Sequence, residues 1–150
     1  MSKKSIAVLT GAGVSAESGL KTYRDNGGLW NDYDPMKVAS VEGWNADPGL
    51  VLEFYNQRRA ELGHTAPNEA HRLIAELENS YKVNVITQNV DNLHERAGST
   101  NMLHLHGELT KIRPENTCND NDNFSEEYVV DIRYGRVVLG DMAPNGAQYR

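Results

Sequence analysis

The sequence predicts an α/β fold with a Rossmann-like, doubly wound parallel sheet, of which this chain supplies the N-terminal part. Short β-rich apolar segments alternate with helical patterns, which favours parallel strands joined by helical crossovers. A glycine-rich turn follows the first of these segments, as is typical of nucleotide-binding sheets. With 150 residues, the chain is long enough to bury a core of its own.

Three segments are predicted to be the strands of this sheet. Ile6–Thr10 is a continuous apolar run that ends before a glycine, which is typical of a buried parallel strand. Val83–Thr87 and Met102–His106 follow, with β-rich or alternating content. Arg136–Gly140 is a fourth and shorter candidate. Because a complete sheet of this class has about six strands, we expect the chain to hold only the first part of one.

Two helices are predicted between the first and second strands. The first begins with Asp47 as N-cap and Pro48 at its first helical position. Spacings of three and four place five of its residues on one side: Val51, Phe54, Tyr55, Arg58 and Leu62. The second helix lies in "PNEAHRLIAELE", with an apolar stripe formed by Ala70, Leu73, Ile74 and Leu77.

Composition excludes several classes of function. The formal net charge of −6 gives little electrostatic support to nucleic-acid binding. No apolar run approaches the ~20 residues that a membrane span needs, and the start of the chain lacks the apolar segment of a secretory signal. The single cysteine, Cys118, excludes an internal disulfide framework and a cysteine-only zinc site. We therefore expect a cytoplasmic protein without nucleic-acid or membrane partners. We also expect it to be a monomer.

The glycine-rich turn is the first candidate site. Gly11, Gly13 and Ala16 match the pattern G-x-G-x-x-G/A directly after a predicted strand. Glycine lets the backbone approach a pyrophosphate, and the N-terminus of the following helix favours its negative charge. Similar turns also occur where packing alone requires small residues, so these residues by themselves leave both interpretations open.

A second group of polar residues follows the strand that ends at Thr87. Gln88, Asn89, Asp91 and His94 come directly after it. Because the carboxyl ends of parallel strands form the ligand crevice, these side chains are expected to face whatever the first loop binds. Amides suit sugar hydroxyls, since each amide both donates and accepts hydrogen bonds. Capping of the next helix by Asn89 or Asp91 would explain one of these groups but not three.

The third group consists of two histidines. His104 and His106 are two residues apart and so share one side of a predicted strand, and Gly107 makes a turn after them. A histidine at the carboxyl end of a strand can act as a base near neutral pH. A metal site would need a third ligand, and no residue nearby in the sequence has the required spacing.

The fourth group is a pair on the first predicted helix. Tyr55 and Arg58 are three residues apart and therefore neighbours in space. A phenol beside a guanidinium makes a good carboxylate receptor, because Arg offers a fork of donors and Tyr one more. The alternative is an arginine that extends to solvent beside a tyrosine at the edge of the core.

With these groups, the sequence resembles the sirtuin family of NAD-dependent protein lysine deacylases. "GAGVSAESGLKTYRD" is similar to the family motif G-A-G-x-S-x-x-S-G-I-P-x-F-R, with Lys21 in place of Pro and Tyr23 in place of Phe. "TQNVDNLH" matches T-Q-N-x-D-x-L-H, and "LHGE" matches L-H-G. The resemblance runs from Ile6 to about Leu109.

The resemblance implies NAD as co-substrate and an acyl-lysine protein or peptide as substrate, with nicotinamide and O-acyl-ADP-ribose as products. It implies that His106 is the general base and that Asn89 and Asp91 also belong to the catalytic site. It further implies that Tyr55 and Arg58 bind the substrate, as the Y-x-x-R pair does in the branch that removes succinyl or malonyl groups, with deacetylation also expected. The residues that it implies for NAD binding are Gly11, Ala12, Gly13, Ser15, Glu17, Tyr23, Arg24, Asp25, Gln88, Asn89 and Asp91.

The chain departs from the family pattern in two ways. The family's structural zinc is usually held by four cysteines after the catalytic histidine, where this chain has only Cys118, so we expect no zinc. The expected organisation is a Rossmann-like NAD-binding part over 1–109, a small insert module without zinc over 110–138, and a return toward the first part over 139–150. The chain also ends before the family's W-F-G-E-like segment, so the resemblance implies an N-terminal fragment.

Two other functions stay open from the sequence. An NAD glycohydrolase or ADP-ribosyltransferase could use the same pocket with another nucleophile, although it would have no use for a carboxylate receptor at Tyr55 and Arg58. The other alternative is a truncated, inactive chain that binds partners through an exposed sheet edge.

Overall fold

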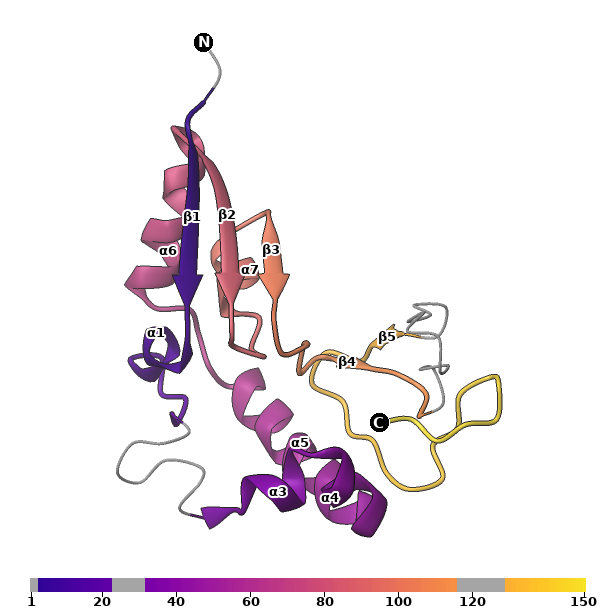
Figure 1. Ribbon diagram of the computed structural model, residues 1–150. Helices are drawn as coiled ribbons and strands as arrows, with labels where there is room; N and C mark the ends of the chain where they lie inside the picture. The colour runs from indigo at the N-terminus through magenta and orange to yellow at the C-terminus, as the bar shows by residue number, and fades with distance from the viewer. Residues whose placement is uncertain (1–2, 23–31, 116–128) are drawn as a thin grey trace. The chain divides into compact units, whose positions relative to one another are not determined.

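A computed structural model describes residues 3–22, 32–115 and 129–150. The chain forms two compact units (Figure 1). Unit 1 comprises Met1–Asp32 and His64–Glu108, and unit 2 comprises Tyr33–Gly63 and Leu109–Arg150. The expected boundary after residue 109 lies one residue from the end of unit 1, whereas the expected boundary after residue 138 falls inside unit 2. Residues 33–63, which we expected in the Rossmann-like part, belong to unit 2.

The centre of unit 1 is a three-stranded parallel sheet with the order β1-β2-β3 (Figure 1). Its strands are β1 (Ser5–Thr10), β2 (Lys82–Thr87) and β3 (Met102–His104). The three predicted strands and the parallel α/β arrangement are therefore confirmed. The third strand is shorter than predicted, because Leu105 and His106 already belong to a turn and Gly107 follows with a positive φ of 84°.

Three helices accompany this sheet: α1 (Ala12–Ala16), α6 (Glu69–Glu76) and α7 (Leu93–Ala97). Asn68 caps α6, because its side-chain oxygen accepts hydrogen bonds from the backbone N–H groups of Ala70 and His71. A short 3₁₀ turn, η1 (Leu77–Asn79), continues α6. Helix α7 ends at Gly98, whose φ of 111° is a left-handed conformation that favours glycine.

The predicted apolar stripe of α6 is wrong by one position. Its buried side carries His71 and the partly buried Ile74, whereas Ala70 is exposed and Leu73 and Leu77 remain 53% and 36% exposed. The reason is a buried contact that periodicity cannot detect. The ring of His71 packs edge-to-face on that of His94 in α7, with 4.7 Å between the ring centroids.

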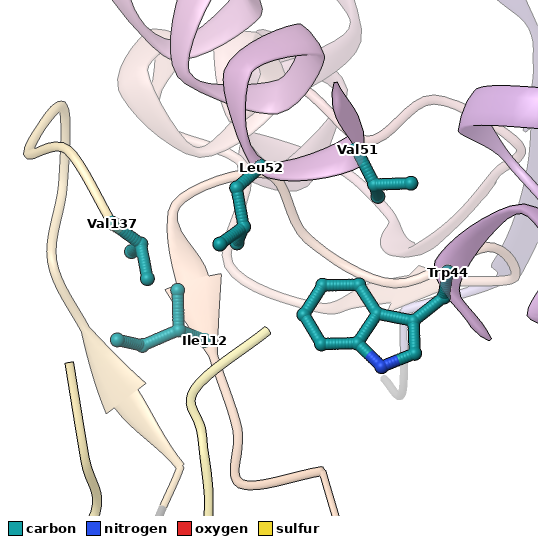
Figure 2. Close-up of a cluster of buried hydrophobic side chains, with 5 residues drawn as sticks. All are labelled: Trp44, Val51, Leu52, Ile112 and Val137. Carbon is teal, nitrogen blue, oxygen red and sulfur yellow. The ribbon is translucent and has the colours of Figure 1, made fainter. Parts of the chain in front are cut away.

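Unit 2 contains the helices α3 (Pro35–Val38), α4 (Val41–Ala46) and α5 (Pro48–Gly63). Its two strands, β4 (Lys111–Ile112) and β5 (Val130–Asp131), pair antiparallel. Helix α5 starts at Pro48 as predicted, and the Asp47 side chain accepts a hydrogen bond from the N–H of Leu50. Figure 2 shows the apolar core of this unit, in which five side chains gather: Trp44, Val51, Leu52, Ile112 and Val137.

A polar pair on α5 completes the core of unit 2. Arg59, only 4% exposed, donates hydrogen bonds to the carbonyl oxygens of Gly135 and Leu109 and to the side chain of Asn56. Asn56 in turn bonds both the N–H and the C=O of Val137. This side chain gives Val137 the partners that a neighbouring strand would provide.

Two further predictions for unit 2 are therefore wrong. Residues 136–140 form no strand, because the amide of Asn56 satisfies the backbone of Val137. The buried side of α5 includes Asn56 and Arg59, whereas Tyr55 and Arg58, predicted to share the buried side, are only partly buried. Apolar spacing could not choose between the adjacent arginines.

No helix in the described ranges is long and apolar enough to cross a membrane. Cys118 lies outside the described residues.

Replacing Arg59 with alanine is expected to lower the free energy of unfolding by about 3 kcal/mol, because the buried Leu109 carbonyl oxygen and the buried Asn56 side chain lose a charged donor. Urea denaturation of the complete protein, followed by circular dichroism, measures this change. Arg58→Ala is the matched control and is expected to cost about 1 kcal/mol or less, since its ion-pair partner Glu61 is half exposed. Equal losses in the two variants would contradict the role given to Arg59.

Candidate functional site

The candidate site lies where β1 and β2 end side by side. Thr10 and Thr87, the last residues of these strands, are direct neighbours in the parallel register. The hydroxyl of Thr10 donates to that of Thr87 over 2.9 Å, and the Thr87 hydroxyl accepts the backbone N–H of Asn89 over 3.0 Å. The segments that follow the two strands therefore begin side by side, at residues that are hydrogen-bonded to each other.

Ser15, Asn89 and Asp91 form a buried polar cluster at this edge. The Ser15 hydroxyl donates to Asp91 Oδ2 over 2.9 Å and accepts a hydrogen bond from Asn89 Nδ2 over 3.1 Å. All three side chains are less than a tenth exposed. Asp91 Oδ1 also accepts the N–H of Leu93 and so orients the start of α7. Three predicted site residues from two distant sequence motifs thus meet, and Asp91 has both a capping role and a role in the cluster.

The glycines of the first loop have no structural reason within the described chain. Gly11 and Gly13 have no positive φ, and nothing lies within 4 Å of the position that a Cβ would take at either residue. Larger side chains would therefore fit the fold itself. Glycine here leaves open space beside Ser15, which is what a ligand that approaches the backbone requires.

Two other predicted residues belong to the same loop and helix. Ala12 begins α1 and is half-buried, and Glu17 is exposed at the end of this helix. Tyr23, Arg24 and Asp25 lie outside the described residues.

The two histidines near the end of β3 contact consecutive backbone carbonyls. Nδ1 of His104 is 2.8 Å from the carbonyl oxygen of Asn89, and Nδ1 of His106 is 3.0 Å from that of Gln88. A carbonyl oxygen only accepts, so each Nδ1 carries a hydrogen. In a neutral His106 this leaves Nε2 as a free lone pair, and the side chain is exposed.

The environments of these histidines differ, contrary to the expectation that they share one side of a strand. His106 lies in the turn after β3, whereas the side chain of His104 is 9% exposed and its Nε2 lies 2.6 Å from Glu95 Oε1. Burial alone would lower the pKa of His104. The hydrogen bonds to Glu95 and the Asn89 carbonyl, with the charges of Glu95 and Glu108, outweigh burial and raise this pKa above its ordinary value.

Glu95 is a residue that the sequence interpretation missed. Burial is the largest single influence and acts to raise the pKa of its carboxyl, but the hydrogen bond from His104, together with a backbone hydrogen bond and the charges of His104 and His94, lowers it. Ligand atoms of Glu95, His104 and Glu108 lie within 4.8 Å of one another, a grouping that sequence spacing did not reveal. The short His104–Glu95 contact already engages Nε2, so we describe this group as an ion pair.

His94 and His71 are buried next to the candidate site. Nε2 of His94 lies 3.1 Å from the Thr10 hydroxyl, and His71 is part of the capping box of α6. Both side chains are at most 1% exposed, and burial lowers the pKa of each. His94, which the motif placed among the ligand-facing groups, is thus a buried support. The Asn-x-x-His spacing of Asn68 and His71 was the available signal for the cap.

Tyr55 and Arg58 lie in unit 2, on α5. The Arg58 side chain is 15% exposed, and its guanidinium is 5.4 Å from the centroid of the Phe54 ring. Its Nη2 donates to Glu61 over 2.9 Å, but its buried Nε and Nη1 have no hydrogen-bond partner among the described residues. Burial raises the pKa of the Tyr55 phenol, against the opposing charge of Arg59. Within the part of the chain that the structure describes, Arg58 therefore has two donors without a partner.

Comparison with known proteins identifies relatives over nearly the whole chain. The model of the Sir2 family matches residues 11–138. An NAD-dependent protein deacylase of Bacteroides thetaiotaomicron is 51% identical over 149 residues, which are 98% of this chain and 62% of that protein. An NAD-dependent protein deacylase of Helicobacter pylori is 52% identical over 147 residues, 98% of this chain and 59% of the relative. The chain thus spans about three fifths of the length of these relatives.

The fold has solved counterparts as well. The crystal structure of a Sir2 homologue in complex with NAD superposes with a TM-score of 0.78 at 40% identity. The match covers 99% of this chain and 56% of that protein.

The free energy of unfolding is expected to depend on the neutral state of His71 and His94. Their pKa values are lowered in the folded state, so their contribution is present above the unfolded value of about 6.5 and is lost as the pH falls. When the pH falls from about 7.5 to about 5.5, the free energy of unfolding is expected to decrease by roughly 1 kcal/mol less in His71→Gln than in the wild type. For one histidine this difference cannot exceed ~1.4 kcal/mol per pH unit. Urea denaturation at both pH values measures this difference.

The control for this measurement is His64→Gln, because His64 is exposed. Its pH dependence is expected to equal that of the wild type. An unchanged pH dependence in His71→Gln would contradict the interpretation of His71 as a buried neutral group.

Proposed function

The chain belongs to the Sir2 family, and on this premise we propose that its protein is an NAD-dependent lysine deacylase. The substrate would be an acylated lysine of a protein or peptide, with negatively charged succinyl or malonyl groups preferred and acetyl groups also accepted. The products would be the free lysine, nicotinamide and O-acyl-ADP-ribose.

The observation that carries this proposal is the buried Ser15–Asn89–Asp91 cluster beside two glycines that the fold itself does not require. Such a set of fixed dipoles suits a ligand with both phosphates and sugar hydroxyls, since the open backbone admits the phosphates and the amides bind hydroxyls. We assign the NAD phosphates and adjoining ribose to the segment Gly11–Ser15. Gln88 and Asn89 would contact the nicotinamide ribose, and Asp91 the carboxamide.

The family motif extends this assignment to four more residues. We propose that Glu17, Tyr23, Arg24 and Asp25 complete the binding of NAD, the last three from the segment outside the described residues.

When bound, NAD would supply an electrophilic ribose carbon whose bond to nicotinamide breaks in the reaction. The residues of this chain would bind the ribose with side chains whose orientation is already fixed by hydrogen bonds before the ligand arrives. Because Ser15 already bonds both Asn89 and Asp91, little reorganisation is needed when charge develops on the ribose.

His106 is proposed as the general base. Its Nδ1–H donates to the carbonyl oxygen of Gln88, which leaves the lone pair of Nε2 to accept the proton of a ribose hydroxyl. The side chain is exposed, so a bound ligand can reach it.

Arg58 and Tyr55 are proposed to bind the carboxylate of the acyl group. A guanidinium with two unpartnered buried donors costs free energy unless a ligand satisfies them, and a carboxylate matches that fork. The tyrosine hydroxyl would add a neutral donor, since burial disfavours its ionised form.

In the complete protein, nicotinamide release from NAD is expected to require an acyl-lysine peptide. His106→Ala should lower kcat about 100-fold or more, because the ribose hydroxyl loses its base. His64→Ala, a change at an exposed histidine outside the site, should leave kcat unchanged. Release that proceeds equally well without the peptide would refute the deacylase proposal and favour an NAD glycohydrolase.

Arg58→Met should separate the acyl substrates. The value of kcat/KM for a succinyl-lysine peptide is expected to fall about 100-fold, the loss of a charged, bidentate hydrogen bond, whereas the acetyl-lysine value should change only a few-fold. Arg136→Met is the matched control, since Arg136 is exposed and bonds Glu53. Equal losses on both peptides would mean that Arg58 does not read the acyl carboxylate.

A further inference from the structure

His104 is a partly buried neighbour of the candidate site, bonded to Glu95, that the proposed reaction does not yet use. It lies two residues before the proposed base, His106. His104 bonds the carbonyl oxygen of Asn89, and His106 bonds that of Gln88. The segment Gln88–Asn89 is therefore held by two imidazoles, one on each carbonyl. Only His106 is exposed, so the two rings must have different tasks.

The geometry determines the charge of His104. Its Nδ1 faces a backbone carbonyl oxygen at 2.8 Å, which can only accept a hydrogen bond. Its Nε2 faces a carboxylate oxygen of Glu95 at 2.6 Å, which also accepts when ionised. Both ring nitrogens must then donate, and an imidazole that donates twice carries a positive charge.

Asn89 is the residue that this charge holds. Its carbonyl oxygen accepts from His104, its N–H donates to the Thr87 hydroxyl, and its side-chain amide donates to Ser15. The backbone N–H, the carbonyl oxygen and the side-chain amide of Asn89 are thus bonded to residues of three different elements, β2, β3 and α1. Without the bond to the carbonyl, the backbone on the C-terminal side of the Asn89 Cα loses its anchor, so the residue can shift and move its side-chain amide away from Ser15.

We propose that His104 and Glu95 form a positioning pair that holds Asn89 in the orientation needed to bind the ribose of the cofactor. The inference rests on the proposed function, since it assigns Asn89 to the nicotinamide ribose. His104 touches neither reactant. It acts through Asn89, and Glu95 acts by keeping His104 charged.

The pair should make the reaction sensitive to alkaline pH. The charged groups around the ring are Glu95 from α7 and Glu108 from the segment after β3, which favour the imidazolium, and the pKa of His104 is raised accordingly. Among the described residues, His94 of α7 is a further titratable group that interacts with His104, and burial lowers its own pKa, so it favours the neutral form near neutral pH. As the pH rises through the pKa of His104, the ring keeps the Nε2 hydrogen that faces the Glu95 carboxylate and loses the one on Nδ1, so the contact with the Asn89 carbonyl oxygen becomes repulsive.

Glu95→Gln in the complete protein tests the pair. This variant keeps an amide oxygen for Nε2–H but removes the charge that stabilises the imidazolium. We expect kcat/KM for NAD to fall about tenfold at neutral pH, the effect of a small displacement of a binding group. The alkaline limb of the pH profile should also move about one pH unit lower, because the opposite charge is lost.

Glu78→Gln is the matched control. Glu78 also accepts two hydrogen bonds, from the N–H and hydroxyl of Thr100. Thr100 precedes β3, so this contact lies at the end of the strand opposite to His104. This variant should keep the kcat/KM and pH profile of the wild type.

Long-range proton–nitrogen correlation spectra of the histidine rings provide a readout that does not depend on activity. At neutral pH the His104 ring should be doubly protonated in the wild type and in Glu78→Gln, and should lose a proton at lower pH in Glu95→Gln. This measurement stands even if the protein proves not to be a deacylase, so failure of the pair and failure of the proposed function are distinguishable.

Four results would overturn the inference. A neutral His104 ring in the wild type would remove its basis. A wild-type pH profile in Glu95→Gln, or an equal loss in Glu78→Gln, would reduce Glu95 to a structural residue. Loss of activity with a chelator, restored by a divalent metal, would show that Glu95, His104 and Glu108 hold a cation instead.

Discussion

The parallel, in-register pairing of β1 with β2 is the constraint on which the candidate site depends. Because Thr10 lies directly beside Thr87, the segments that leave the two strands begin at the same edge. Ser15 and Asn89, separated by 74 positions in the chain, can then form a hydrogen bond. A register slip of one residue would turn the side chain of Thr87 to the other face of the sheet and remove the hydroxyl that holds the Asn89 amide.

Hydrogen-bond satisfaction distinguishes the structural polar groups from those that await a ligand. Arg59 has partners for all three guanidinium nitrogens within unit 2, so its role is to stabilise the backbone at Gly135 and Leu109. Arg58, the next residue toward the N-terminus, leaves Nε and Nη1 without partners among the described residues. Buried donors of this kind cost about 1–3 kcal/mol each, which makes an external carboxylate a physically reasonable partner.

Most of the sheet and the polar cluster could be predicted from the sequence, because strands and motifs are local signals. The three apolar segments became the three parallel strands, and two motifs placed Ser15, Asn89 and Asp91 at one edge. The errors occurred where buried polar side chains replaced apolar ones. Neither His71 in α6 nor Asn56 in α5 has a signature in apolar periodicity, and Asn56 also provides the backbone partners that a predicted strand at 136–140 would have needed.

The sequence by itself determined the order of the strands and motifs, the polar edge of the sheet and the resemblance to the sirtuins, since each depends on residues close together in the chain. Only the tertiary structure decided which of two neighbouring residues is buried and charged. His104 is paired with Glu95 while His106 is exposed, and Arg59 is enclosed while Arg58 has two donors without partners among the described residues. The reason is that burial and ion pairing depend on partners far away in the sequence. Adjacent residues of the same type cannot reveal by their spacing which of them will meet those partners.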